Sequence, residues 1–296
     1  MSEIFSRLRN RATQTGKIAT MPIIEPVDSE NNRDFEESSP EAVESSALAD
    51  GVSSETLEVR NDTHFNLAAA DQRIRSVLDP LTQVGDQYRL LRTKLAQMQK
   101  EKGIRTLLVT SSMPKEGKTF TACCLAGIFA QEPGKRVLLI DADLRKPRTG
   151  PSLGINEVEP PAGLSQVLRG EKRVEDVLLS SSKMEFFLLP AGPVPEDPAD
   201  VLSSPNLERT IKKMAKLFHW IVVDSPPILE LADAPLLAAL CDATLLVVRA
   251  GKTPAKIARE SVQKIGKERI CGIVINRSKG VRSSKYYYYS YYRKQS

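Results

Sequence analysis

Eight consecutive residues, Ser112 to Thr119, have the composition of a loop that binds phosphate groups. Their sequence, SMPKEGKT, follows the spacing G-x-x-x-x-G-K-[ST], with serine in place of the first glycine. In such a loop, backbone N–H groups and the start of the next helix face phosphate oxygens. Gly117 would allow close backbone approach, Lys118 would neutralise phosphate charge, and the Thr119 hydroxyl would bind Mg²⁺. The predicted nucleotide-binding residues are Ser112, Pro114, Lys115, Glu116, Gly117, Lys118, Thr119 and Phe120.

Three aspartates follow apolar segments elsewhere in the chain. Asp141 and Asp143 end the segment RVLLIDAD, and Asp224 ends WIVVD. Two carboxylates only two residues apart repel each other unless a cation or a proton lies near them. Asp224 stands where a phosphate-loop nucleotidase holds Mg²⁺ through water. The plainer alternatives are a turn cap at Asp224 and solvated loop acids at the other two positions. The predicted metal-side residues are Thr119, Asp143 and Asp224.

Short apolar strands and helices alternate around these residues. Strands are predicted over 106–111, 136–143, 185–190, 220–227, 244–250 and 270–277, and helices over 86–102, 118–131, 163–170, 206–218 and between the last two strands. Fully apolar strands that alternate with helices indicate a mostly parallel sheet with helices on both faces. Ligands bind at the carboxyl ends of such strands, where the phosphate loop and the aspartates would meet. The predicted fold class is therefore α/β, of the P-loop NTPase type.

Charge and composition divide the 296 residues into segments. The net charge of +5 is unevenly distributed over an acidic head, a mixed body and a basic end. The head has eleven acids and one base over 25–58, and the end has six bases and no acid over 277–296. We expect a short amphipathic helix, or a frayed terminus, over 1–12. A disordered acidic linker is predicted over 13–80, a P-loop domain over 84–277 and a flexible tyrosine-rich tail over 278–296.

Composition also argues against several classes of protein. The four cysteines contain no C-x-x-C pair and the two histidines are far apart, so a structural zinc site is not expected. No apolar run approaches the ~18 residues of a spanning helix, and no signal peptide is visible at the start. We therefore expect a cytoplasmic protein. Because the positive charge is so unevenly distributed, we do not expect a nucleic-acid partner.

Tyrosine is the most unevenly distributed residue type. Six of the seven tyrosines lie in YYYYSYY, over 286–292. A phenol has a pKa of about 10 and is a poor nucleophile at neutral pH. Phosphoryl transfer to a tyrosine therefore needs an acidic residue that orients the phenol. The plainer interpretations are an aromatic edge strand, an aggregation-prone end, or a surface that stacks single-stranded nucleic acid.

Together these segments resemble the bacterial tyrosine kinases of capsule and exopolysaccharide synthesis. The shared motifs are P-x-E-G-K-[ST] at 114–119, D-x-D-x-R at the end of 137–145, D-x-P at the end of 221–226, and the tyrosine cluster. The resemblance covers roughly 86–292 and makes 84–277 a kinase domain that uses ATP and Mg²⁺. It implies that Lys118 and Asp141 are catalytic, with Asp141 orienting the phenol. It also implies that the chain phosphorylates its own tail, in a neighbouring subunit, to regulate exopolysaccharide or capsule synthesis and export. The implied autophosphorylation sites are Tyr286, Tyr287, Tyr288, Tyr289, Tyr291 and Tyr292.

The chain departs from the family pattern at two places. Lys115 stands where the family usually has glycine, which adds a cation to the loop and puts turnover in question. The motif E-x-x-R-x-x-R, which contacts the neighbouring subunit in the family, reads Asp86, Arg89 and Arg92 here, and an ordinary helix face is the alternative. The resemblance implies a homo-oligomer with further protein substrates. It also implies a membrane activator like a polysaccharide co-polymerase, which recruits the protein to the inner face of the cell membrane.

Two other functions share the predicted fold. A partitioning-type ATPase switch has the same loop, but it carries an extra lysine at the position of Met113, and it leaves the tyrosines unexplained. A catalytically weak nucleotide-binding regulator would follow if Lys115 prevents turnover. A eukaryotic-type protein kinase is excluded because no G-x-G-x-x-G, H-R-D or D-F-G motif is present.

Overall fold

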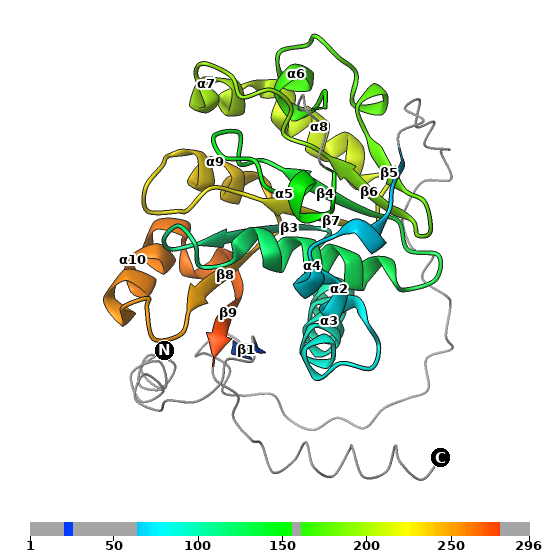
Figure 1. Ribbon diagram of the computed structural model, residues 1–296. Coiled ribbons are helices and arrows are strands. Elements are labelled where there is room, and N and C mark those ends of the chain that lie inside the picture. Colours follow the sequence, from blue (N-terminus) through cyan, green and yellow to red (C-terminus); the bar gives the residue numbers. More distant parts are fainter. Residues whose placement is uncertain (1–20, 26–63, 156–160, 279–296) are drawn as a thin grey trace, which may run out of the picture.

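The computed structural model describes residues 21–25, 64–155 and 161–278. In this part of the chain, nine strands form a single sheet in the order β1-β9-β8-β3-β7-β4-β6-β5-β2 (Figure 1). The strands are β1 Met21–Glu25, β2 His64–Phe65, β3 Thr106–Ser111, β4 Val137–Asp141, β5 Leu179–Ser181, β6 Phe186–Leu189, β7 Trp220–Asp224, β8 Ala243–Arg249 and β9 Ile270–Ser278. The run from β9 to β6 is parallel, whereas β1 and β5 each pair antiparallel with their inner neighbours.

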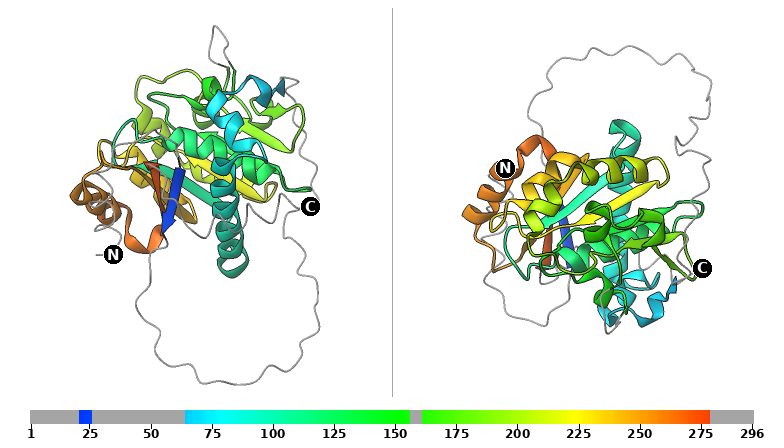
Figure 2. Two further views of the ribbon diagram at one scale, coloured as in Figure 1. Left: turned by 60° about the horizontal axis from the view of Figure 1, so that its bottom comes forward. Right: turned by 90° about the horizontal axis from the view of Figure 1, so that it is seen from above.

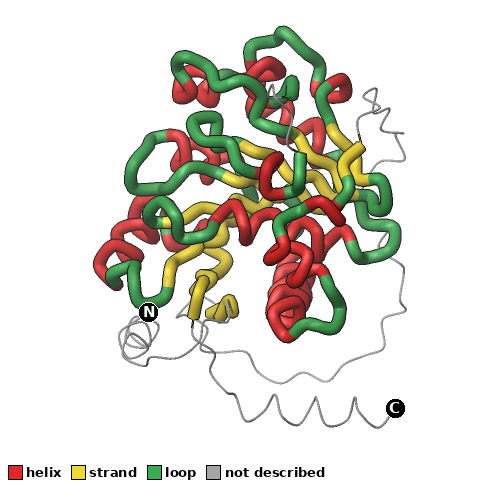
Figure 3. Tube along the Cα trace, in the orientation of Figure 1, coloured by secondary structure: helices red, strands yellow, loops and turns green. Residues whose placement is uncertain are grey.

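Helices cover both faces of the sheet, as Figure 3 shows. The α-helices are α2 Gln72–Leu78, α3 Gln83–Lys102, α4 Lys118–Ala130, α5 Thr149–Ser152, α6 Leu164–Leu168, α7 Pro198–Ser203, α8 Pro205–Ala215, α9 Asp233–Leu240 and α10 Ala255–Ile265. Short 3-10 turns lie at Leu67–Ala69, Val174–Asp176 and Lys267–Arg269. Along β3, Leu107 and Val109 join a buried cluster with α2, α3 and α4, while Leu108 joins a second cluster with α6 to α10. This alternation confirms the predicted α/β fold with helices on both faces.

Strand register places the predicted chemical residues at one edge of the sheet. Asp141 at the end of β4 is the direct partner of Asp224 at the end of β7. β3 lies on the other side of β7 and leads into the phosphate loop. The loop ends at Gly117, whose φ of 104° lies in the left-handed region that favours glycine, and α4 begins at the next residue.

The predicted disordered linker over 13–80 is too long at its C-terminal end. Residues 64–80 contain β2, a 3-10 turn and α2, and the apolar side chains Ile74 and Val77 of α2 are buried in the core. Asp71 begins α2 by accepting a hydrogen bond from Arg73 N at 2.8 Å. The acidic composition of the whole segment concealed this short apolar periodicity. The predicted terminal helix over 1–12 and the tyrosine tail beyond Ser278 lie outside the described residues.

A second part of the predicted linker also belongs to the sheet. β1 pairs with β9 in the register Glu25↔Ile273, Ile24↔Val274 and Ile23↔Ile275, and Figure 2 shows the two strands side by side. The register shifts between Ile23 and Met21, which pairs with Ser278. β1 and β2 therefore occupy opposite edges of the sheet. Across the ranges that the structure describes, none of the helices has the length and apolar composition needed to cross a membrane.

Candidate active site at the carboxyl edge of the sheet

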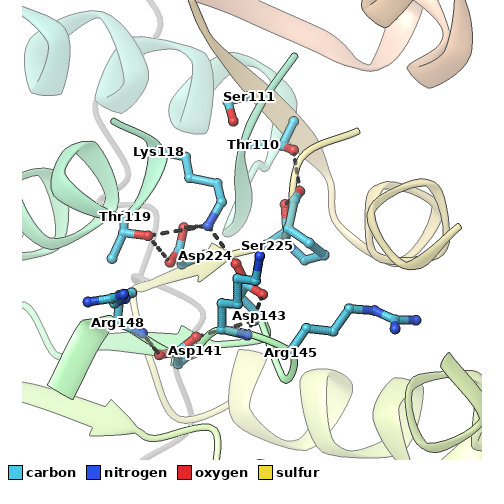
Figure 4. A network of polar contacts seen from close by, with 12 residues as sticks. Thr110, Ser111, Lys118, Thr119, Asp141, Asp143, Arg145, Arg148, Asp224 and Ser225 are labelled. Atoms are coloured by element: carbon cyan, nitrogen blue, oxygen red, sulfur yellow. Dashed lines mark hydrogen bonds and ion pairs between the residues drawn. The ribbon is translucent and has the colours of Figure 1, made fainter. Parts of the chain in front are cut away.

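A lysine between two buried carboxylates forms the centre of the site (Figure 4). Lys118 Nζ donates to Asp143 Oδ2 at 2.8 Å and lies 3.7 Å from Asp224 Oδ1. The neighbouring Thr119 hydroxyl donates to Asp224 Oδ2 at 2.6 Å. These side chains come from the first turn of α4, the end of β7 and the loop after β4. The structure thus brings together four of the residues predicted from sequence.

Burial controls the electrostatics of this cluster. Removal from water raises the pKa of Asp224 to about 7, although the nearby Lys118 ammonium acts in the opposite direction. Burial alone would lower the pKa of Lys118, but the carboxylates of Asp224 and Asp143 outweigh it, so the net shift is upward. Lys118 therefore remains a cation while Asp224 is held close to its titration point near neutral pH.

Asp141 is buried but makes different contacts. Its Oδ2 accepts hydrogen bonds from the Thr149 hydroxyl at 2.7 Å, from Thr149 N at 3.0 Å and from Arg148 N at 3.1 Å. Its Oδ1 accepts from Asp143 N at 3.2 Å. Burial raises the pKa of Asp141, and the Thr149 hydrogen bonds oppose that shift. Asp141 therefore fixes the loop that carries Asp143, and Thr149 is a supporting residue that local spacing did not reveal.

The same cluster fits a magnesium ion with phosphate groups. Asp224 Oδ1 is buried and has no hydrogen-bond partner among the described residues, which is unusual for a buried carboxylate oxygen. Within the described ranges, no three acidic, histidine or cysteine side chains converge closely enough to form a metal site. Mg²⁺ is usually bound by one or two carboxylates together with substrate phosphates. Thr119, Asp143 and Asp224 supply that kind of partial set.

The phosphate loop contains residues with contrasting roles. Lys115 is exposed and has a φ of 64°, which is unusual for a residue with a side chain. Glu116 is buried, and its Oε2 accepts from Met113 N at 2.9 Å across the loop. Phe120 packs edge-on against Tyr88 of α3, with ring centroids 6.4 Å apart. The Glu116 and Phe120 side chains therefore make protein contacts, and the groups of this segment that could bind phosphate are the backbone N–H groups and the Lys118 ammonium.

Sequence reasoning missed two residues that contact the loop from other elements. The Thr253 hydroxyl, on the connection between β8 and α10, donates to Glu116 Oε1. Asn276 Nδ2, near the end of β9, donates to the Glu116 carbonyl at 2.8 Å. Asn276 comes at the end of an apolar run, as Asp141 and Asp224 do, and that position could have identified it. Nothing in the spacing around Thr253 marks it.

The predicted subunit-contact residues make contacts within the single chain. Arg89 pairs with Asp86 at 2.9 Å on the same face of α3. Arg92 pairs with Glu132 at 3.2 Å and donates to the Ile128 carbonyl at 3.1 Å. A role for these residues between subunits stays a prediction. Arg145, the arginine of the D-x-D-x-R motif, pairs with the buried Asp233 at the start of α9 at 2.8 Å.

Comparisons with known proteins add independent information. Residues 115–265 match a family model described as an AAA domain. The chain is 33% identical over 220 residues to tyrosine-protein kinase YwqD of Bacillus subtilis, a match that covers 74% of this chain and 91% of that protein. It is 29% identical over 237 residues to succinoglycan biosynthesis transport protein ExoP of Rhizobium meliloti, of which it spans only 29%. The kinase domain of the Escherichia coli tyrosine kinase ETK superposes with a TM-score of 0.63 at 30% identity, covering 71% of this chain and 83% of that structure.

Proposed function

The chain belongs to the family of bacterial tyrosine-protein kinases, and we propose on that premise that it transfers the γ-phosphoryl group of ATP to its own C-terminal tyrosines. The observation that carries the proposal is the placement of Lys118 between Asp143 and Asp224 at the start of α4. The substrate cluster in the same chain comprises Tyr286, Tyr287, Tyr288, Tyr289, Tyr291 and Tyr292. Transfer would take place between neighbouring subunits.

Phosphoryl transfer depends mainly on positioning and on charge stabilisation. In the proposed reaction, the backbone of residues 112–119 and the Lys118 ammonium hold the phosphates of ATP. Thr119, Asp143 and Asp224 would hold Mg²⁺, which neutralises phosphate charge when it is bound. The phenol oxygen forms a bond to the γ-phosphorus as the bond to ADP breaks, and the phenol proton passes to a carboxylate.

Asp141 is the carboxylate that we assign to orient the phenol. This assignment is supported by the position of Asp141 at the end of β4, directly beside Asp224 in the sheet register. The three hydrogen bonds to Oδ2 hold its carboxylate in one orientation. In this assignment Asp143 stays on the metal side, because its Oδ2 already pairs with Lys118.

We also propose the setting in which the reaction takes place. The kinase is assigned to a homo-oligomer in which α3 contributes to the subunit contact. A membrane protein like a polysaccharide co-polymerase would activate it and recruit it to the inner face of the cell membrane, and other proteins would serve as further substrates. The similarity to ExoP, whose name describes succinoglycan biosynthesis and transport, supports a role in exopolysaccharide synthesis.

Labelling of the full chain tests the proposal. We would incubate it with Mg²⁺ and γ-labelled ATP and map the labelled peptides beside Lys118→Met and a variant with all six cluster tyrosines changed to Phe. We expect label on tail tyrosines in the wild type alone, and retained nucleotide binding in the six-Phe variant. Release of phosphate without labelling would favour a partitioning-type ATPase. Binding without labelling, even with an activator present, would favour a regulator.

A further inference from the structure

Glu116 is a buried acid within the phosphate loop, and its carboxylate contacts protein on both oxygens. Oε2 accepts from Met113 N at 2.9 Å and thereby closes the loop on itself. Oε1 accepts from the Thr253 hydroxyl, which lies on a different element, after β8. Burial raises the pKa of Glu116, and the Thr253 hydrogen bond opposes that shift. The carboxylate is thus a link between the loop and the β8–α10 connection.

The orientation of the Thr253 hydroxyl is determined by its second partner. Arg249 N donates to Thr253 Oγ1 at 2.8 Å, and Thr253 N donates to the Arg249 carbonyl at 3.0 Å. Because a backbone N–H can only donate, the single hydroxyl hydrogen is left for Glu116. Thr253 is itself buried, so water does not readily replace this contact. The turn from Arg249 to Thr253 therefore presents one donor to the loop in one direction.

Asn276 contacts the same loop residue through the backbone. Its Nδ2 donates to the Glu116 carbonyl at 2.8 Å, while its Oδ1 accepts from Arg277 N at 2.8 Å. A Cβ atom on Gly117 would lie 1.9 Å from Asn276 Nδ2, so this approach requires glycine. Glu116 is consequently held at its side chain by one neighbouring element and at its carbonyl by another.

A loop with an unfavourable backbone conformation needs such contacts. Lys115, directly before Glu116, has a φ of 64°, and this left-handed conformation is sterically unfavourable for a residue with a Cβ atom. Strained backbone persists only where the surrounding structure fixes it. The hydrogen bonds to Glu116 supply that constraint at the adjacent residue.

We infer that Thr253 is a positioning residue of the phosphate loop, which acts through Glu116 and is required for tight binding of ATP. The inference rests on the proposed function in that ATP is taken as the ligand. The contacts of the Thr253 hydroxyl are with Glu116 and Arg249 N, so its effect on the phosphates is assigned to Glu116. It sets the direction in which the loop presents its backbone N–H groups before the nucleotide arrives.

Binding of the fluorescent nucleotide mant-ATP with Mg²⁺ to the full chain tests this inference. Thr253→Val removes the hydroxyl at nearly constant volume, and with it the hydrogen bond from Thr253 to Glu116 Oε1. Loss of a hydrogen bond to a charged group should weaken binding about tenfold. Thr253→Ser keeps the hydroxyl and should bind within about twofold of the wild type. The KM for ATP should rise in Thr253→Val by more than kcat falls.

A matched control exists on the preceding strand. Thr244 on β8 is also buried, but its hydroxyl has no hydrogen-bond partner among the described residues. Thr244→Val should therefore leave the affinity for mant-ATP unchanged. If Thr253→Val does not fold, Thr253→Ala removes the same hydroxyl with a smaller side chain and carries the same test.

The outcomes separate this inference from the proposed function. A wild-type chain that does not bind mant-ATP would overturn the kinase proposal itself. If the wild type binds and labels its tail, but Thr253→Val binds equally well, only the role of Thr253 is overturned. A lower melting temperature at unchanged affinity would assign Thr253 a purely structural role and would also overturn it.

Discussion

The ammonium of Lys118 lies 2.8 Å from the carboxylate of Asp143, so these two charges form an ion pair. Phosphate groups that enter the loop would compete with Asp143 for Lys118, and the released carboxylate would then be free for a cation. This exchange ties phosphate binding to the metal side of the site. A substitution of Asp143 would therefore test both phosphate binding and metal binding.

We predict that Asp143→Asn lowers tail labelling about 100-fold, because it removes one of the carboxylates that would hold Mg²⁺ against the negative charge of the transition state. The Mg²⁺ concentration for half-maximal labelling should rise, since one anionic ligand is lost. Labelling rates measured over a range of Mg²⁺ at saturating ATP would check this. An unchanged Mg²⁺ dependence would remove Asp143 from the metal side.

Changing Thr149 tests the assignment of Asp141. Thr149→Val removes the 2.7 Å hydrogen bond to Asp141 Oδ2, and we expect tail labelling to fall about tenfold at unchanged affinity for ATP. Thr149→Ser keeps the hydroxyl and should restore labelling. Wild-type labelling by Thr149→Val would show that the orientation of Asp141 is unimportant for transfer.

The stability of the nucleotide-free chain should depend on pH through Asp224. Its pKa is raised in the folded state to about 7 from an ordinary 3.8, so the folded chain holds a proton that the unfolded chain releases. Stability should therefore fall as the pH rises from about 4 to 7, by on the order of 1–4 kcal/mol. Urea unfolding at several pH values measures this. Asp224→Asn should flatten the slope, and an equal slope in both proteins would contradict the prediction.

Lys115→Gly should stabilise the chain. Glycine adopts a φ of 64° without the steric cost that Lys115 bears. Glycine also increases the conformational entropy of the unfolded chain, which cancels part of the increase in stability. The net increase in the free energy of unfolding should be about 0.5–1 kcal/mol. Lys172, an exposed lysine outside the left-handed region, provides the control. Lys172→Gly should not stabilise, and equal effects of both changes would exclude a conformational origin.

Phosphorylation of the tail should change the assembly. The segment over 277–296 carries six positive charges, and each phosphotyrosine adds about −1.5 to −2. We expect the tail to reverse sign and the oligomer to loosen. Light scattering with ATP should show a lower mass for the wild type, whereas the variant with six Phe residues should not change. Identical responses would refute the idea.

Much of the site could be predicted because its chemistry is local in the sequence. Lys118 and Thr119 follow a recognisable spacing, and Asp141 and Asp224 end apolar runs that form β4 and β7. In a parallel sheet the ends of such runs meet at one edge, and the register Asp141↔Asp224 shows this. The fold class followed from the same alternation of strands and helices.

The remaining features depend on contacts between distant segments. Thr253 and Glu116 are 137 positions apart, and no short motif encodes their contact. α2 was missed because its few apolar residues lie next to an acidic segment whose overall composition dominated the prediction. β5 and β1 are short strands at or near the edges of the sheet, and their pairing with β6 and β9 depends on tertiary packing.

The strand β1 has a consequence for handling the protein. β9 is nine residues long and largely buried, and β1 covers its outer side. A shortened chain that begins after Glu25 would leave the backbone N–H and C=O groups of β9 open along that side. Such an exposed edge can form hydrogen bonds with strands of other molecules, which promotes aggregation. Shortening the chain to its catalytic part is therefore expected to reduce solubility, whereas retaining residues 21–25 protects against aggregation.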